Sequence, residues 1–187
     1  MTTVSMDLVR ELREKTQVGL MDCKKALAQA EGDFNQAVQI LKKRGLAAAE
    51  KKAQRQATQG MIFSYIHMGG KIGVLVEINC ETDFVARNKQ FQDLAKEVAL
   101  QIAGTHPTPL YVSKDDLKDS DHARIQDEFQ GKPEKYYEQV CLLDQPYIKD
   151  SSIKMSQLVQ SKIAELGENI VIRRFVRYQL GEMASAS

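Results

Sequence analysis

The chain is short of several features that would each point to a class of protein. It has no tryptophan and only four prolines in 187 residues, and no apolar run is long enough to cross a bilayer. The opening stretch, "MTTVSMDLVREL", lacks the apolar centre of a secretory signal, and its Asp7 and Glu11 argue against a transit peptide. We therefore expect a cytoplasmic protein that has no contact with a membrane.

Cysteine is also scarce. Cys23, Cys80 and Cys141 are an odd number and lie far apart in the sequence. No CxxC or Cys/His spacing typical of a zinc site is present, so no metal site is expected. The three residues are predicted to be free thiols in a reducing compartment.

An excess of charge of one sign is missing too. The chain has 26 Lys and Arg against 25 Asp and Glu, a formal net charge of +1. A nucleic-acid-binding protein usually shows a basic excess, so no direct contact with nucleic acid is expected. The short basic clusters at 42–44 and 51–55 lack interleaved aromatic residues and are interpreted as solvated helix surface.

Motifs for catalysis are absent from the sequence. There is no GxGxxG, no Walker-type loop and no HExxH. His67, His106 and His122 lie in different predicted elements, and none is next to a cysteine or carboxylate in a recognised motif. We expect a protein without catalytic chemistry of its own and without a cofactor.

Residues 1–45 contain three short patterns that predict helices. Met6, Val9 and Leu12 recur at helical spacing in the first. "TQVG" (16–19) separates it from the second, which stops near Gly32. The third is predicted to begin at Asp33, a good N-cap, and to end at "KKRG" (42–45), because basic residues and glycine favour a helix C-terminus. Residues 46–59 are Ala-rich and polar, and are predicted to be a helical or flexible connector between domains.

From Gly60 the apolar period changes to two. "MIFSYIH" (61–67) and "KIGVLVEINC" (71–80) flank the turn "MGG" (68–70) and predict a hairpin. An amphipathic helix that carries Phe91 follows and ends at Gly104, and another runs from Ser156 to Gly167. Residues 113–150 are acidic and give no clear pattern. Residues 60–181 are thus predicted to form an α+β core with an antiparallel sheet, followed by a disordered tail at 182–187.

The last strand, "NIVIRRFVRYQLG" (169–181), alternates along its whole length. Alternation predicts two faces, because successive side chains of a strand point in opposite directions. The first face carries Ile170, Ile172, Arg174, Val176, Tyr178 and Leu180; the second carries Val171, Arg173, Phe175 and Arg177.

Two stretches are candidate partner-binding surfaces. In "TDFVARN" (82–88), Thr82 is expected to cap a helix and Asp83 to favour its positive end. From the residues alone, Phe84 is a core residue below that cap, or it is presented to another protein at a strand-to-helix corner. In "VGLMDCKKAL" (18–27), Leu20 and Met21 can hardly both be buried, so one of the pair is core and the other is exposed by chance or by function.

Several long motifs in order make the chain resemble bacterial-type translation elongation factor Ts. They are "LVRELREKTQVGLMDCKKALAQAEGDFNQAVQILKKRGLAAA" (8–49), then "TDFVARN", "CLLDQPYIKD" and "GENIVIRRFVRYQLGE". The resemblance covers nearly the whole chain. It implies that residues 1–45 form a ubiquitin-associated-type bundle, and that the chain is a guanine-nucleotide exchange factor for elongation factor Tu. In this family the corner disturbs the magnesium and phosphate site of the partner, so that GDP leaves and GTP can bind.

The resemblance also assigns residues and an assembly. The disruptive segment is Thr82, Asp83, Phe84 and Val85, supported by Arg87 and Asn88, with further contacts from Arg13, Leu20, Met21 and Lys24. Residues 112–137 look shorter than the family usually has there. The second core subdomain of long family members is missing, and short members can form homodimers, so a homodimer is expected.

Two other functions are compatible with parts of the sequence. An adaptor that binds proteins through its N-terminal bundle would have no use for "TDFVARN", and residues 1–55 alone should then bind. A small-molecule enzyme would need a pocket with converging polar groups.

Overall fold

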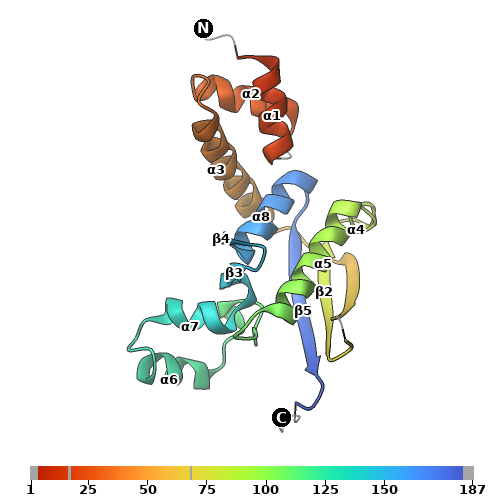
Figure 1. Cartoon of the computed structure of the whole chain (residues 1–187), viewed down its shortest axis with the longest axis vertical. Helices are drawn as coiled ribbons and strands as arrows, with labels where there is room; N and C mark the ends of the chain where they lie inside the picture. Colours follow the sequence, from red (N-terminus) through yellow and green to blue (C-terminus); the bar gives the residue numbers. More distant parts are fainter. Residues whose placement is uncertain (1–3, 17, 68, 183–187) are drawn as a thin grey trace.

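Three helices form the N-terminal end of the molecule (Figure 1). The structure, a computed structural model, describes residues 4–16, 18–67 and 69–182. The helices are α1 (Met6–Thr16), α2 (Leu20–Gln29) and α3 (Phe34–Lys52). Their facing stripes bury Val9, Leu12, Cys23, Ala26, Leu27, Ala37 and Leu41 in one small core. Asp33 caps α3 by accepting a 2.8 Å hydrogen bond from the Gln36 amide, as predicted.

The predicted end of the third helix at Gly45 is wrong. α3 continues to Lys52, and its second half packs against α8 (Met155–Leu166) of the core. A Cβ atom on Gly45 would lie 3.5 Å from the Cβ of Ala164, an ordinary contact distance, so this position faces α8 and is not a helix stop. Ala49 is buried in the main core. The predicted limits of the N-terminal domain (1–45) and connector (46–59) therefore divide a continuous helix, and the division into domains stays a prediction.

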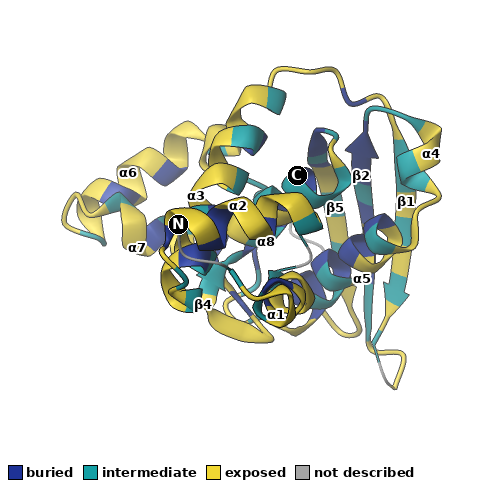
Figure 2. Ribbon diagram, turned by 90° about the horizontal axis from the view of Figure 1, so that it is seen from above, coloured by how far each residue is buried: buried dark blue, intermediate teal, exposed yellow. Residues whose placement is uncertain are grey.

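A three-stranded antiparallel sheet forms the centre of the core. β2 (Ile72–Cys80) lies between β1 (Gln59–Ile66) and β5 (Ile170–Gln179), so the predicted hairpin and late third strand are confirmed. α5 (Lys89–Gly104) and α8 cover one face, where Phe91, Val98 and Met155 are buried with Val76 and Ile78 of β2. Most of β2 is buried, whereas much of β1 is exposed (Figure 2). The α+β class is confirmed.

The predicted faces of the last strand are wrong beyond Ile172. Ile78 pairs with Ile172 and Glu77 with Arg174, so Arg173 is an extra residue at a β-bulge. One extra residue reverses the direction of every later side chain. Phe175 therefore lies opposite Val76 and packs against the core, while Val176 and Tyr178 face outward.

Residues 113–154 hold two α-helices, two short 3-10 helices (η) and a small hairpin that the sequence did not reveal. They comprise η1 (Lys114–Asp116), α6 (Asp119–Asp127), α7 (Pro133–Val140), η2 (Leu142–Asp144), β3 (Pro146–Tyr147) and β4 (Asp150–Lys154). α6 and α7 lie side by side at the edge of the core (Figure 1). The buried carboxylate of Asp121 joins them, because it accepts hydrogen bonds from the hydroxyls of Tyr111, at 2.8 Å, and Tyr136.

Several predictions concern residues outside the described part of the chain. These are the break at Gln17, the turn residue Met68 and the tail from residue 183. Within the described residues, no helix has the length and apolar character needed to pass through a bilayer.

Candidate partner-binding site

The chain leaves the central strand β2 at Cys80 and turns sharply into the one-turn helix α4 (Asp83–Ala86). Thr82 caps this helix: its backbone is extended and its hydroxyl accepts a 3.4 Å hydrogen bond from the Val85 amide. The predicted cap is confirmed. α4 lies at the end of the sheet nearer the N-terminal bundle (Figure 1).

The corner points its two apolar side chains in opposite directions. Val85 is partly buried and packs against the main core, whereas Phe84 is 82% exposed. Of the two readings that the sequence left open for Phe84, the structure supports the exposed one. The ring is presented at the tip of the corner and is not part of the core.

Charged and polar side chains complete α4 and start the next helix. Asp83 forms an exposed 3.0 Å ion pair with Arg87, four residues later. Such an exposed pair is worth only about 0.5 kcal/mol, so it restrains Asp83 weakly. Asn88 begins α5 as a separate N-cap, because its side chain accepts a 2.8 Å hydrogen bond from the Gln90 amide.

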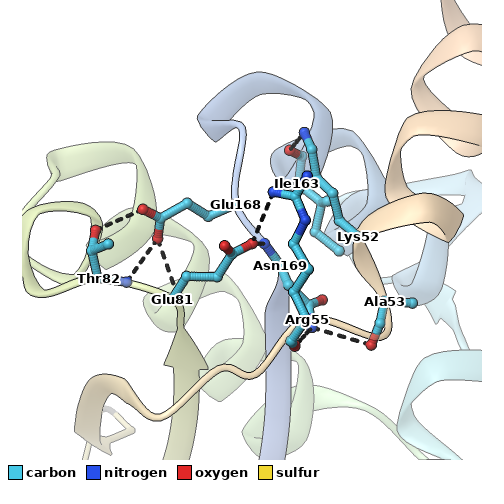
Figure 3. Close-up of polar contacts among 8 residues, drawn as sticks. All are labelled: Lys52, Ala53, Arg55, Glu81, Thr82, Ile163, Glu168 and Asn169. Atoms are coloured by element: carbon cyan, nitrogen blue, oxygen red, sulfur yellow. Dashed lines mark hydrogen bonds and ion pairs between the residues drawn. The ribbon is translucent and has the colours of Figure 1, made fainter.

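Glu168, in the turn between α8 and β5, holds the corner from behind (Figure 3). One carboxylate oxygen accepts hydrogen bonds from the amides of Glu81, at 3.1 Å, and Thr82, at 3.0 Å. The other accepts a 2.6 Å hydrogen bond from the Thr82 hydroxyl. No local pattern in the sequence points to Glu168, although the residue lies in the "GENIVIRR" motif.

Glu81 and Asn169 reinforce the same junction. The Glu81 carboxylate accepts a 2.6 Å hydrogen bond from the backbone amide of Asn169 and forms a 3.6 Å ion pair with Arg55. The Asn169 side chain donates to the carbonyls of Ala53, at 3.3 Å, and Arg55, at 2.8 Å. These contacts fasten the chain that leaves α3 to the end of the sheet (Figure 3).

The thiol of Cys80 sits beneath the corner. It donates a 3.1 Å hydrogen bond to the Thr82 carbonyl. Burial, together with the nearby charge of Glu168, raises the pKa of Cys80 to about 11. The thiol therefore stays protonated at neutral pH and acts as a packing residue, because only the thiolate is a good nucleophile. Cys23 and Cys141 are likewise free and buried.

The predicted N-terminal contact residues lie apart from the corner, in the helical bundle. Leu20 begins α2 and packs partly against the bundle core, whereas Met21 is 63% exposed. Arg13 on α1 and Lys24 on α2 are exposed. The structure therefore places the predicted residues in two groups, one at the corner and one on the bundle.

Among the described residues, no group of three or more His, Cys, Asp or Glu could hold a metal ion. An open cleft of about 580 Å³ lies between α3, α8 and β5, with apolar walls and the carboxylates of Glu50, Asp115 and Asp116. Neither histidine nor cysteine lines it, and the corner residues do not reach it.

Comparison with known families matches the model described as Elongation factor TS to residues 48–128 and 114–182. A relative from Anaeromyxobacter sp. (strain Fw109-5), named elongation factor Ts, is 52% identical over 198 residues, covering 97% of this chain and 90% of the relative. That aligned length exceeds the 187 residues of the chain, so the relative carries residues that this chain lacks.

Two further relatives carry the same name and cover almost the whole chain. The protein of Desulforamulus reducens is 50% identical over 97% of this chain and 91% of its own length. The protein of Thermodesulfovibrio yellowstonii is 47% identical over 96% of this chain and 97% of its own length. With a family model over most of its length and these near full-length relatives, the chain belongs to the elongation factor Ts family.

Proposed function

We propose that this chain is a guanine-nucleotide exchange factor for elongation factor Tu. The observation that carries the proposal is Phe84, an aromatic ring 82% exposed on a corner whose base is fixed by Thr82 and Glu168. In this proposal the ring and the neighbouring Asp83 press on the part of the G domain that supports the magnesium ion. Magnesium and phosphate contacts weaken, GDP leaves, and GTP takes its place in the cytoplasm.

Such an activity needs no reaction on the factor itself. A protein that binds the distorted or nucleotide-free partner better than the GDP form must weaken GDP binding by the same factor. Each tenfold of that coupling requires about 1.4 kcal/mol of differential contact. Burying one Phe side chain supplies about 2–3 kcal/mol, so the corner cannot provide a coupling of several orders of magnitude alone.

The exposed surface of the N-terminal bundle is the proposed second contact. Met21 offers an exposed apolar side chain on α2, three residues before the exposed Lys24, and Arg13 is exposed on α1 of the same bundle. An apolar centre with a charged rim is typical of a protein interface. We infer that this surface binds the G domain and holds the corner in place, while the corner does the distorting. No nucleic acid, membrane or cofactor takes part.

The outer face of the sheet is the proposed dimer contact. It carries the exposed apolar side chains Ile62, Ile66, Leu75, Val176, Tyr178 and Leu180. Ser64 and the Glu77–Arg174 ion pair lie on the same face, so the exposed apolar side chains are interrupted by polar ones. Exposed apolar side chains gathered on one face of a chain mark an interaction site. We propose that a second copy of the chain covers it.

The exchange function is tested by GDP release. Catalytic amounts of the wild-type protein should accelerate the release of labelled GDP from elongation factor Tu. With the Phe84→Ala variant, elongation factor Tu should release GDP at least tenfold more slowly than with the wild-type protein. The variant loses the apolar contact that is made only in the distorted complex. Its fold should be unchanged, since the ring contributes little to the core.

Leu110→Ala is the matched control, because Leu110 is another exposed apolar residue, 60% exposed and outside the sheet and both contact groups. It should exchange like the wild type. No acceleration by the wild-type protein would disprove the function. A Phe84→Ala variant with full activity would disprove the role of the ring.

A further inference from the structure

We propose that Glu168 is a positioning residue for exchange: its carboxylate fixes the direction in which Phe84 projects. The inference rests on the proposed function, because it concerns how the same corner is held. Glu168 comes from the turn between α8 and β5, 86 residues away from Thr82 in sequence. It does not need to touch the partner to act.

The contacts of Glu168 converge on the backbone just before α4. The amides of Glu81 and Thr82 lie beyond Cys80, the last residue of β2 that is paired in the sheet. The Glu168 carboxylate accepts from both, at 3.1 and 3.0 Å, and from the Thr82 hydroxyl at 2.6 Å. A carboxylate that accepts several hydrogen bonds is a strong and directional restraint.

The restraint matters because α4 is too short to be stable without contacts to the rest of the protein. It has four residues, and an isolated helix of that length is not stable in water. The orientation of Phe84 is therefore set by the contacts at the two sides of α4. On one side Val85 packs against the core, and on the other Glu168 fixes Thr82, whose hydroxyl caps the helix. A misplaced contact group loses most of its effect even when the displacement is small.

The neighbouring residue, Asn169, fastens the segment that follows α3. Asn169 binds the carbonyls of Ala53 and Arg55, where the chain leaves α3. Two consecutive residues thus fasten two segments at the same end of the sheet: Glu168 fastens the corner, and Asn169 fastens the segment that leaves α3 (Figure 3).

Three variants separate geometry from charge. Glu168→Gln keeps the length of the side chain, with a carbonyl oxygen for the two amides and an NH₂ group that can donate to the Thr82 hydroxyl. Glu168→Asp keeps the charge but withdraws it from the amides, and Glu168→Ala removes every acceptor. Glu97→Ala is the matched control, since Glu97 also accepts two 2.6 Å hydrogen bonds, from Tyr147 and Lys149, away from the corner.

We expect the maximal rate of GDP release to fall roughly tenfold in Glu168→Ala and less in Glu168→Asp, with Glu168→Gln close to wild type. The concentration of factor that gives half the maximal rate should change little, because the N-terminal surface is intact. The double variant Phe84→Ala, Glu168→Ala should be no slower than Phe84→Ala alone, since residues that act through one contact are not additive. Glu97→Ala should leave the rate unchanged.

A second measurement needs no partner. Amide hydrogen exchange at Glu81 and Thr82 in the free protein should become faster in Glu168→Ala and Glu168→Asp, and stay slow in Glu168→Gln. If Glu168→Ala does not fold, the comparison of the Asp and Gln variants decides the question.

The outcomes that overturn this inference differ from those that overturn the exchange function. Normal GDP release in Glu168→Ala and Glu168→Asp, with Phe84→Ala slow, would overturn the positioning role and leave the function standing. Additive losses of GDP-release rate in the double variant would overturn the positioning role as well. So would unchanged amide hydrogen exchange at Glu81 and Thr82 in Glu168→Ala and Glu168→Asp. A wild-type protein that does not accelerate GDP release would instead disprove the function.

Discussion

At the scale of single residues, the corner keeps two neighbouring apolar side chains in opposite environments. Val85 packs into the core, whereas Phe84 stays 82% exposed. A Phe side chain that remains in water forgoes about 1.5–3 kcal/mol of stabilisation that burial would provide. Folding alone therefore does not explain Phe84, and its side chain contributes to stability only when another molecule covers it.

Asp121 is a residue whose effect on stability depends on pH. Burial alone would raise its pKa, but hydrogen bonds from Tyr136, the Lys118 amide and Tyr111 outweigh burial and hold the pKa below the usual value of a carboxyl group. A lowered pKa in the folded state stabilises the fold above the unfolded-state pKa of about 4, and this contribution is lost as the pH falls below that value.

Asp121→Asn should therefore lower the free energy of unfolding by about 1–3 kcal/mol at pH 7, because the tyrosine hydroxyls lose a charged acceptor. The difference from wild type should shrink as the pH falls from 5 to 2. Urea unfolding across that range measures both. Asp127→Asn, at an exposed position of the same helix, is the control. A difference that stays constant with pH would contradict the role of the charge.

Residues whose role is local were predictable from the sequence, and those whose role depends on distant partners were not. Thr82 was recognised as a cap because a cap acts on an amide three residues away. Glu168 carries no comparable signal, since its partners Glu81 and Thr82 are more than 80 residues earlier. Only the folded chain brings the turn after α8 to the end of β2.

At the scale of elements, Gly45 marks the place where α3 packs against α8. Glycine weakens a helix, yet Gly45 lies inside α3 at the place where the helix crosses α8. A Cβ atom at this position would already be in contact with Ala164, and Ala49 one turn later is buried in the main core. The contact joins the bundle to the core.

Gly45→Ala should raise the free energy of unfolding by about 0.5–1 kcal/mol, because alanine favours a helix and its Cβ would lie 3.5 Å from Ala164, an ordinary contact distance. Gly45→Leu should lower it, since the longer side chain would push α3 away from α8. Thermal unfolding measures both variants. Ala47→Leu, at an exposed position of α3, should be neutral. A stable Gly45→Leu variant would show that the close approach is dispensable.

The elements themselves were predicted well where the periodicity is local. Alternation predicted β1 and β2, and the spacing from Phe91 to Ile102 predicted α5. The bulge at Arg173 was not predictable, because the sequence of β5 alternates through it without interruption. The bulge exists only in the pairing of β5 with β2, and that pairing reverses the faces of Phe175 and Tyr178.

At the scale of the whole molecule, helices of the described part of the chain cover one face of the sheet and leave the other face exposed. The outer face carries Ile62, Leu75 and Tyr178, which are respectively 67%, 47% and 71% exposed. If a second copy covers this face, light scattering should give about twice the 21.1 kDa mass of one chain. The dimer should weaken at low concentration.

Leu75→Lys should convert the protein to a monomer, because it places a charge at the centre of the apolar face while the inward side of β2 is unchanged. Leu110→Lys, outside the sheet, should leave the mass unchanged. Circular dichroism should confirm that both variants fold. If light scattering gives the wild-type protein the mass of one chain at the concentrations of the exchange assay, the proposed dimer is disproved.

The continuity of α3 has a consequence for the spacing of the two proposed contact surfaces. The bundle that carries Met21 is attached to the core through an unbroken helix, whose far end is fastened by Asn169 beside the corner that carries Phe84. Each residue of a helix advances the chain by 1.5 Å and turns it by about 100°. A single insertion between Gly45 and Lys52 would thus swing Met21 to a different side of the molecule. The length of α3 therefore sets the rotation of the bundle relative to the corner. A rigid partner that binds both surfaces at once would bind poorly to any variant whose change in helix length is not close to a whole number of turns.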